Sequence, residues 1–457
     1  MTLEEKIGQM FFPRFNLENS TDDIQNKKPG GFVLFAYDFN YEEEYIQKYI
    51  NEIQDLSNKS IGLPLGLSVD EEGGTVCRVS LYHRKEGKFP SPQDIYNEKG
   101  IEGIIQIDQE KRDLLRKFFL NVNLAPVADI SYNSSDYIYP RTLGRLPEET
   151  AEYIKVDVEG YVKDNFTCCS KHFPGYGNNI DTHGDIAIDT RSYETFLNED
   201  FKTFEAAIAS KIPMILVSHN IVICKDDKYP ASISKTWHEI LRNELNYSGL
   251  ILTDDLSMGA IKKYTNNVSE AVLAVQAGND ILLTSDYYIH YNAVIKAAKE
   301  GIISEDIINT ACRRIISWKL KYLMNYSPES DETDIPTDDK TDIPTDDTSV
   351  IPSDDKTDIP TDDTSDIPTD DTSDIQTDDT SIIPTDDKSD FPTDDKTDRK
   401  TDEEEGNSDT NTIIIISVIS GVVVIGIAIF IYFKFLNGKK KDVNIGQITQ
   451  EEPLVQD

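Results

Sequence analysis

The chain has 457 residues, and 83 acidic against 45 basic side chains give it a formal net charge of −38. Contact with nucleic-acid phosphates requires a basic patch, so this balance disfavours nucleic acid as a partner. The composition changes after residue 327, because the acidic excess is concentrated in 328–411 while 1–327 has ordinary apolar content. We therefore expect one folded domain over 1–327, followed by segments of a different kind.

Seven short apolar runs alternate with amphipathic stretches in the folded part. They span 31–36, 65–71, 123–130, 167–174, 213–220, 250–256 and 280–286. Continuous apolar character is typical of parallel strands covered on both faces. Most of these runs end in an ionisable residue: Asp70, Asp129, His172, His219 or Asp254. Polar groups at many strand ends favour a barrel over a doubly wound sheet, so we predict an α/β fold, a (β/α)8 TIM barrel with one strand still unplaced.

Residues 328–411 carry a repeat rich in Asp, Thr and Pro with a period of eight. The sequence D-I-P-T-D-D begins at Asp334 and recurs at Asp342, Asp358 and Asp366. One isoleucine per repeat cannot bury enough apolar area to offset chain entropy, and the like charges repel one another. We expect a disordered, extended stalk.

An uncharged run of 21 residues occupies 413–433. At a rise of ~1.5 Å per residue, a helix of this length crosses a hydrocarbon core of ~30 Å. Lysines follow the run at 434 and 439–441, whereas the preceding side is acidic. The positive-inside rule then predicts a single-pass membrane protein. On this prediction, 412–434 form the transmembrane helix and 435–457 a cytosolic tail, and residues 1–411 are extracellular or luminal.

The N-terminus does not match this topology, because MTLEEKIGQM has no apolar core of a secretory signal. We expect either that a leader precedes this start or that the membrane segment itself directs insertion. The five cysteines are an odd number in mainly apolar surroundings, which predicts buried thiols and no disulfide framework.

Six motifs resemble glycoside hydrolase family 3, and most closely its β-N-acetylhexosaminidase (NagZ-like) branch. They are SVDEEGGTVCRV (68–79), NLAPVADI (123–130), PRTLG (140–144), KHFPGYGNNIDTH (171–183), ILTDDLSM (251–258) and AGNDILL (277–283). They occur in family order over about the first 325 residues. The resemblance implies a TIM barrel that is an exo-acting, retaining β-N-acetylglucosaminidase, with terminal GlcNAc of peptidoglycan fragments or chitooligosaccharides as substrate.

The same resemblance implies catalytic roles. A retaining glycosidase needs a carboxylate nucleophile and a proton donor for the leaving oxygen. Asp254 matches the nucleophile, and Asp255 should point away from it because side chains alternate along a strand. The acid/base of this branch is a histidine oriented by an aspartate, which places His183 and Asp181 in these roles. Glycines in the preceding loop are expected to free the backbone, so that the loop carries the pair over the site.

Further positions match the family's sugar contacts: Asp70, Arg78, Arg141, Lys171 and His172. We also expect His219 to line the site, with a packed barrel histidine as the alternative. No zinc site is expected, because no third and fourth ligands accompany the Asp-x-His pair at useful spacing. The chemistry that the resemblance implies needs no metal or organic cofactor. The sequence departs from its relatives at Glu71, Tyr176 and Pro140, and the last two are places where aglycone preference could differ.

Three alternatives stay open. Another family 3 β-glycosidase, such as a β-glucosidase or β-xylosidase, typically lacks the Asp-x-His pair. A phosphorylase would use the same histidine. A non-catalytic, surface-displayed carbohydrate-binding protein would use the barrel for binding and the stalk for presentation.

Overall fold

The structure is a computed structural model that describes residues 1–181, 187–265 and 268–324. The predicted stalk, transmembrane helix and cytosolic tail, together with His183, lie outside the described residues. Within those residues, no helix is long and apolar enough to cross a membrane. The described residues fall within one unit, Met1–Pro344.

The described residues form eight parallel strands in a curled sheet. The strands are β1 (Phe11–Pro13), β2 (Gly31–Val33), β3 (Gly66–Val69), β4 (Val122–Asn123), β5 (Thr167–Phe173), β7 (Met214–Val217), β9 (Leu250–Thr253) and β10 (Leu282–Thr284). Strands β2, β3, β4, β5, β7 and β9 pair in that order, and β1 pairs with β10. Isolated parallel bridges, Arg14 with Val33 and Leu252 with Ile281, join the two groups at both seams. The result is a (β/α) barrel-like fold, as the sequence predicts.

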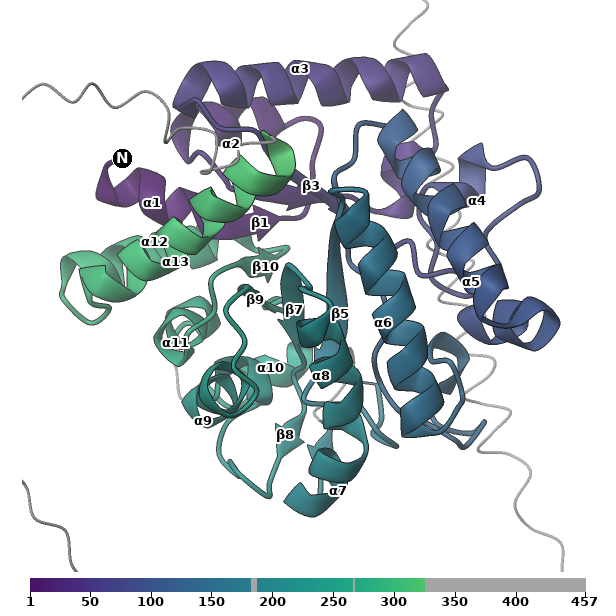
Figure 1. Cartoon of the computed structure of the whole chain (residues 1–457). Helices are drawn as coiled ribbons and strands as arrows, with labels where there is room; N and C mark the ends of the chain where they lie inside the picture. The colour runs from purple at the N-terminus through teal and green to yellow at the C-terminus, as the bar shows by residue number, and fades with distance from the viewer. Residues whose placement is uncertain (182–186, 266–267, 325–457) are drawn as a thin grey trace, which may run out of the picture. The chain divides into compact units, whose positions relative to one another are not determined.

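One helix, α1 (Leu3–Gln9), precedes β1, and others follow the strands and lie around the outside of the sheet (Figure 1). These others are α2 (Ser20–Asn26), α3 (Glu43–Ile61), α4 (Ser80–His83), α5 (Pro92–Lys117), α6 (Pro147–Lys163), α7 (Tyr193–Asn198), α8 (Asp200–Ala209), α9 (Lys235–Glu239), α10 (Gly259–Lys262), α11 (Glu270–Ala277), α12 (Tyr287–Lys299) and α13 (Glu305–Trp318). A small separate sheet pairs β6 (Ile188–Asp189) with β8 (Ile221–Val222) beside the main sheet.

Local sequence signals set the ends of the long helices. Ser91 caps α5 by accepting the Asp94 N–H, and Pro92 occupies its first turn, where no N–H is needed. Helix α3 ends at Gly62, whose φ of 75° is the left-handed conformation that glycine adopts readily. At the start of α5, a side chain binds a free backbone N–H group and a proline replaces another. At the end of α3, a glycine allows the backbone to turn out of the helix.

All seven predicted strands are present, and the unplaced eighth is β1. The Phe12 ring from β1 occupies the space beside Gly31 and Gly66, where a Cβ atom would collide with it. Every residue of β5 is buried, in agreement with strands covered on both faces. Apolar side chains thus cover both faces of the sheet, and the polar site residues lie at the carboxyl ends of the strands.

Lys319, which follows α13, is fully buried. Its Nζ donates to Gln9 Oε1 at 2.7 Å, and burial lowers its pKa to about 7. The unfolded chain, with an ordinary lysine pKa of 10.5, therefore binds more protons than the folded chain between about pH 7 and 10.5. Stability rises with pH across this window, and the full cost of burying the charge acts below pH 7.

We expect Lys319→Met to raise the melting temperature by several degrees at pH 6, with a gain that shrinks by pH 9. Thermal unfolding of both proteins at the two pH values measures this, with the exposed Lys296→Met as a control. An equal change at both pH values would show that Lys319 is not the titrating group.

Candidate active site

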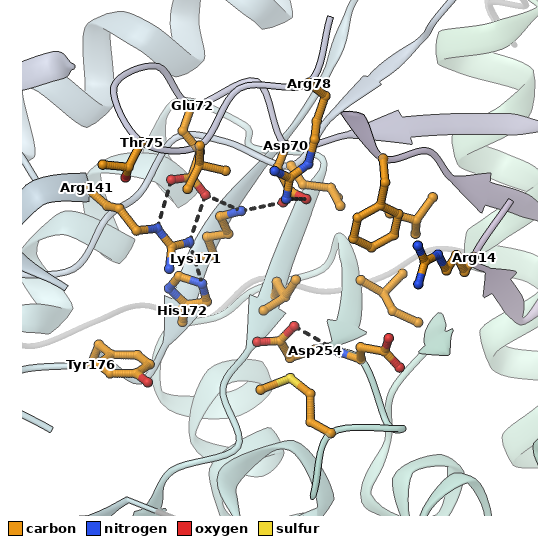
Figure 2. Close-up of a pocket in the computed structure, with 18 of the residues that line it drawn as sticks. Arg14, Asp70, Glu72, Thr75, Arg78, Arg141, Lys171, His172, Tyr176 and Asp254 are labelled. Atoms are coloured by element: carbon orange, nitrogen blue, oxygen red, sulfur yellow. Dashed lines mark hydrogen bonds and ion pairs between the residues drawn. The ribbon is translucent and has the colours of Figure 1, made fainter. Parts of the chain in front are cut away.

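A cavity of about 600 Å³ opens at the carboxyl ends of the strands. Six of the nine predicted site residues are in its wall: Asp70, Arg78, Arg141, Lys171, His172 and Asp254 (Figure 2). They follow or end strands β3, β5 and β9 or lie in loops after β3 and β4. The cavity therefore gathers residues that are far apart in the sequence.

Asp254 and Asp255 follow β9 and have different surroundings. The Asp255 carboxylate accepts the backbone N–H groups of Ser257 and Ser285, at 2.9 and 3.0 Å, and the Ser285 hydroxyl. Asp254 accepts only the adjacent Asp255 N–H, at 2.8 Å, among the bonds that the structure gives it. Asp255 is thus occupied in holding the turn, while Asp254 keeps acceptor capacity toward the cavity.

The Asp254 carboxyl is held in its ionised form. Burial by itself raises its pKa, but the imidazoles of His219 and His172, followed by the Asp255 N–H, outweigh burial and lower the pKa below its ordinary value. A carboxyl ionised at neutral pH can act as a nucleophile or as a stabiliser of positive charge.

Two carboxylates and three cations form a connected network on one side of the cavity. Lys171 Nζ lies 2.7 Å from both Asp70 Oδ1 and Glu72 Oε1. Arg141 donates to Glu72 through two nitrogens, at 2.8 and 2.9 Å, and Arg78 lies 3.2 Å from Asp70. Burial opposes ionisation of Glu72, but Arg141 and Lys171 hold its pKa well below its usual range. The network fixes a dense array of donors and acceptors that matches the hydroxyls of a sugar.

Glu72 is a central residue of this network, and the sequence patterns described above do not single it out. It follows Glu71, and both side chains are buried. Glu71 faces the other way and accepts the backbone N–H groups of Arg78 and Val79, at 2.9 and 2.7 Å. Lys111 on α5 supports the segment by donating to the Glu72 carbonyl at 3.0 Å. The strand's alternation could have suggested opposite directions for the two glutamates, but not which one faces the cavity.

His172 forms a pair with Asp129. The sequence places both residues at strand ends but does not show that they are in contact. His172 Nδ1 lies 2.7 Å from Asp129 Oδ2, and Arg141 Nη2 lies 3.3 Å from His172 Nε2. Because arginine only donates, we assign Nε2 as the acceptor and place the ring proton on Nδ1, toward Asp129. These two contacts fix the orientation of the His172 ring at the cavity wall.

Both Lys171 and His172 face the cavity although they are neighbours on β5. The ladder between β5 and β7 shifts register between Lys171 and Phe173, and such an irregularity re-aims side chains. The pair can therefore contribute together to one site.

His219 is not in the cavity wall. It is fully buried, its Nδ1 lies 2.7 Å from the Ser232 hydroxyl, and its Nε2 lies 3.0 Å from the Asp255 carbonyl. Since a carbonyl only accepts, Nε2 carries the proton. The placement corresponds to the packed barrel histidine that was the alternative, and His219 supports the turn of Asp254 from behind.

Asp181 lies outside the cavity wall, near Tyr137, which is in it. Burial raises the pKa of Tyr137, and the charge of Asp181 and a hydrogen bond to it raise it further. His183, the predicted partner of Asp181, lies outside the described residues. Tyr176 and Pro140, two of the positions where the chain departs from its relatives, line the cavity.

The two glycines of the loop after β5 are packed against side chains. A Cβ on Gly175 would collide with Asp200, and one on Gly177 would collide with Arg191. Arg191 also donates to the Gly175 carbonyl at 3.1 Å and to Asp200 at 2.8 Å. Both glycines thus lie where a Cβ atom would not fit, and both have a positive φ. The movement of the loop over the site stays a prediction.

We expect Gly175→Ala to lower the free energy of unfolding by at least about 2 kcal/mol, because strain at φ 134° adds to the collision. Urea denaturation measures this. Gly301→Ala is the matched control, with φ 73° but nothing within 4 Å, and should cost only about 1 kcal/mol. Equal losses would show that crowding at Gly175 contributes nothing.

Comparison with known proteins agrees with this geometry. Residues 2–318 match the Glycosyl hydrolase family 3 N terminal domain. A β-hexosaminidase of Nitrosomonas eutropha is 31% identical over 279 residues, which are 58% of this chain and 77% of that protein. A solved family 3 β-N-acetylglucosaminidase of Paenibacillus aligns with a TM-score of 0.66 at 27% identity. That alignment covers 72% of this chain and 64% of that protein.

A solved β-N-acetylhexosaminidase of Beutenbergia cavernae shares the fold, with a TM-score of 0.62 at 22% identity, over 70% of this chain and 98% of that one. The family match covers most of the chain and all the elements that build the cavity. The chain belongs to glycosyl hydrolase family 3, as an O-glycosyl hydrolase of the β-N-acetylhexosaminidase type.

Proposed function

We propose that the chain is an exo-acting, retaining β-N-acetylglucosaminidase that releases terminal GlcNAc from peptidoglycan fragments or chitooligosaccharides. The observation that carries this proposal is the position of Asp254. Its carboxyl is held ionised and lies in one cavity with the Asp70–Lys171–Glu72–Arg141 network. Such a network can hold the hydroxyls of one terminal sugar while a carboxylate attacks its anomeric carbon.

In the proposed first step, Asp254 attacks C1, the bond to the leaving oxygen breaks, and a glycosyl ester forms on the carboxylate. His183, oriented by Asp181, donates a proton to the leaving oxygen. In the second step, His183 removes a proton from a water molecule that attacks C1, which restores Asp254 and releases the sugar with its original anomeric configuration. The names of the curated relatives support the reaction class.

Hydrolysis of 4-nitrophenyl glycosides tests the proposed function. The β-N-acetylglucosaminide should be cleaved with a kcat/KM far above that of the β-glucoside and the β-xyloside. A preference for either of the latter would favour another family 3 β-glycosidase. Acceleration by phosphate with formation of a sugar 1-phosphate would favour the phosphorylase. Sugar binding without cleavage of any substrate would favour the carbohydrate-binding protein.

The predicted location remains part of the proposal. Residues 412–434 would anchor the chain by one helix, with the catalytic domain extracellular or luminal and the C-terminus cytosolic. The length and lack of charge of the run 413–433 support this. Extraction of cell membranes at alkaline pH, followed by protease digestion of intact cells or vesicles, tests it. The full chain should stay with the membrane. Protease added to intact cells should digest an extracellular domain and spare the tail, whereas protease added to sealed vesicles should digest the tail and spare a luminal domain.

A further inference from the structure

Arg14 is a cation in the cavity wall that the proposed chemistry does not use. It directly follows β1, at the bridge that joins β1 to Val33 of β2. Figure 2 shows it on the opposite side of the cavity from Arg141, His172 and Tyr176. It therefore lies in the same cavity as the proposed sugar-holding network but away from the network's Arg141 end.

The Arg14 guanidinium is held in a defined position. Its Nε donates to the Tyr37 hydroxyl at 3.0 Å. Its central carbon lies 4.7 Å from the centre of the Phe35 ring and 5.0 Å from that of Tyr37. These contacts use Nε and the faces of the guanidinium, which leaves its two terminal nitrogens as a fork that can bind a carboxylate through two parallel bonds.

The other lysine and arginine side chains of the cavity already lie in ion pairs. Lys171 pairs with Asp70 and Glu72, Arg78 with Asp70, and Arg141 with Glu72. Within the described part of the chain, no carboxylate lies at ion-pair distance from Arg14. The Asp38 carboxylate accepts the Phe35 N–H at 2.7 Å, and it interacts electrostatically with Arg14 without forming an ion pair with it. Arg14 is thus the cation of this wall that is left for an anion brought by the ligand.

We propose that Arg14 forms an anion subsite that recognises a carboxylate on the part of the substrate beyond the terminal GlcNAc. The inference rests on the proposed function and narrows its substrate class to acidic aglycones. A muramic acid residue carries such a group, as a lactyl ether at O3, whereas the second sugar of chitobiose carries a hydroxyl there. The same β-linked GlcNAc would be released from both.

The test compares kcat/KM for two disaccharides that share the released sugar and the linkage, GlcNAc-β-1,4-MurNAc and chitobiose. The wild-type chain should prefer the first, and Arg14→Ala should lower the ratio of the two kcat/KM values by at least about tenfold. Arg14→Lys keeps the positive charge but loses the pair of parallel N–H donors. Its ratio of kcat/KM values should therefore lie between those of the wild type and Arg14→Ala. Wild-type chain should also lose its preference when the lactyl carboxylate is converted to the methyl amide.

Two comparisons make the outcome specific. Arg313→Ala removes an exposed arginine of α13 outside this cavity and should leave the ratio unchanged. Tyr37→Phe removes the hydroxyl that orients Arg14 and should lower the ratio less than Arg14→Ala does. Cleavage of both disaccharides with a ratio that Arg14→Ala does not change would overturn the anion subsite alone. Failure to cleave either one would overturn the proposed function.

Discussion

Asp254→Ala is expected to lower kcat for 4-nitrophenyl β-N-acetylglucosaminide by at least about 10³-fold, because the carboxylate that forms the glycosyl ester is lost. Asp254 lies in a cavity, and the structure gives its carboxylate one hydrogen bond, from the N–H of the next residue. Its removal should therefore affect the fold far less than the reaction. Steady-state kinetics and a thermal unfolding curve of the same preparation separate the two effects.

Asp255→Asn is the matched control, because it alters the adjacent carboxylate. Asp255 holds Ser257 and Ser285 rather than an open position, so its replacement should cost stability and much less activity. Added azide should restore turnover of an activated substrate by Asp254→Ala, with formation of an α-glycosyl azide in the space of the carboxylate. If Asp255→Asn loses as much activity as Asp254→Ala, or if azide restores only the Asp255 variant, the assignment of the nucleophile is wrong.

Glu72→Gln is expected to lower kcat/KM by at least about 10²-fold and the free energy of unfolding by about 3 kcal/mol. The side chain is buried and bonded to Arg141 and Lys171 at 2.7–2.9 Å, so the neutral amide leaves two buried cations with half their counter-charge. The amide nitrogen would also face donors, so both cations should shift and the sugar would lose its preformed partners. Kinetics and urea denaturation measure the two losses.

Glu71→Gln is the control for this change, since it alters the neighbouring buried glutamate in the same way. Glu71 accepts backbone N–H groups and the Ser80 hydroxyl, which an amide can satisfy with one oxygen and one donor nitrogen. Both activity and stability should change little. A large loss from Glu71→Gln, with a small one from Glu72→Gln, would reverse the roles that the structure gives the two residues.

The strands of the fold were predictable because burial on both faces leaves a continuous apolar signature, as in the seven residues of β5. Strand β1 could not be predicted from the sequence because it has only three residues, Phe11–Pro13, and ends in a proline, which has no N–H. Its identity depends on pairing with β10, from the other end of the domain. No local pattern contains that long-range contact.

The site was predictable where a residue type is tied to a strand end. Asp70, His172 and Asp254 lie in the wall of one cavity as expected, whereas Lys171 was predicted from the family resemblance. The site contacts that could not be predicted depend on the direction of each side chain and on partners that are distant in the sequence. The ion pair between Glu72 and Arg141 joins residues that are 69 positions apart in the sequence, and the His172–Asp129 pair joins residues that are 43 positions apart. Arg14 escaped for the same reason, since the sequence near β1 gives no sign that it faces the cavity.

The most direct test is to trap the glycosyl ester and locate it. A 5-fluoro-N-acetylglucosaminyl fluoride should react and accumulate, because the ring fluorine slows both steps while the fluoride leaving group keeps the first one fast. Tryptic digestion and mass spectrometry should then find the added sugar on the peptide 243–262, with fragment ions assigning it to Asp254. A sugar on Asp255 or on another peptide, or turnover that gives the inverted anomer with no ester, would contradict this account.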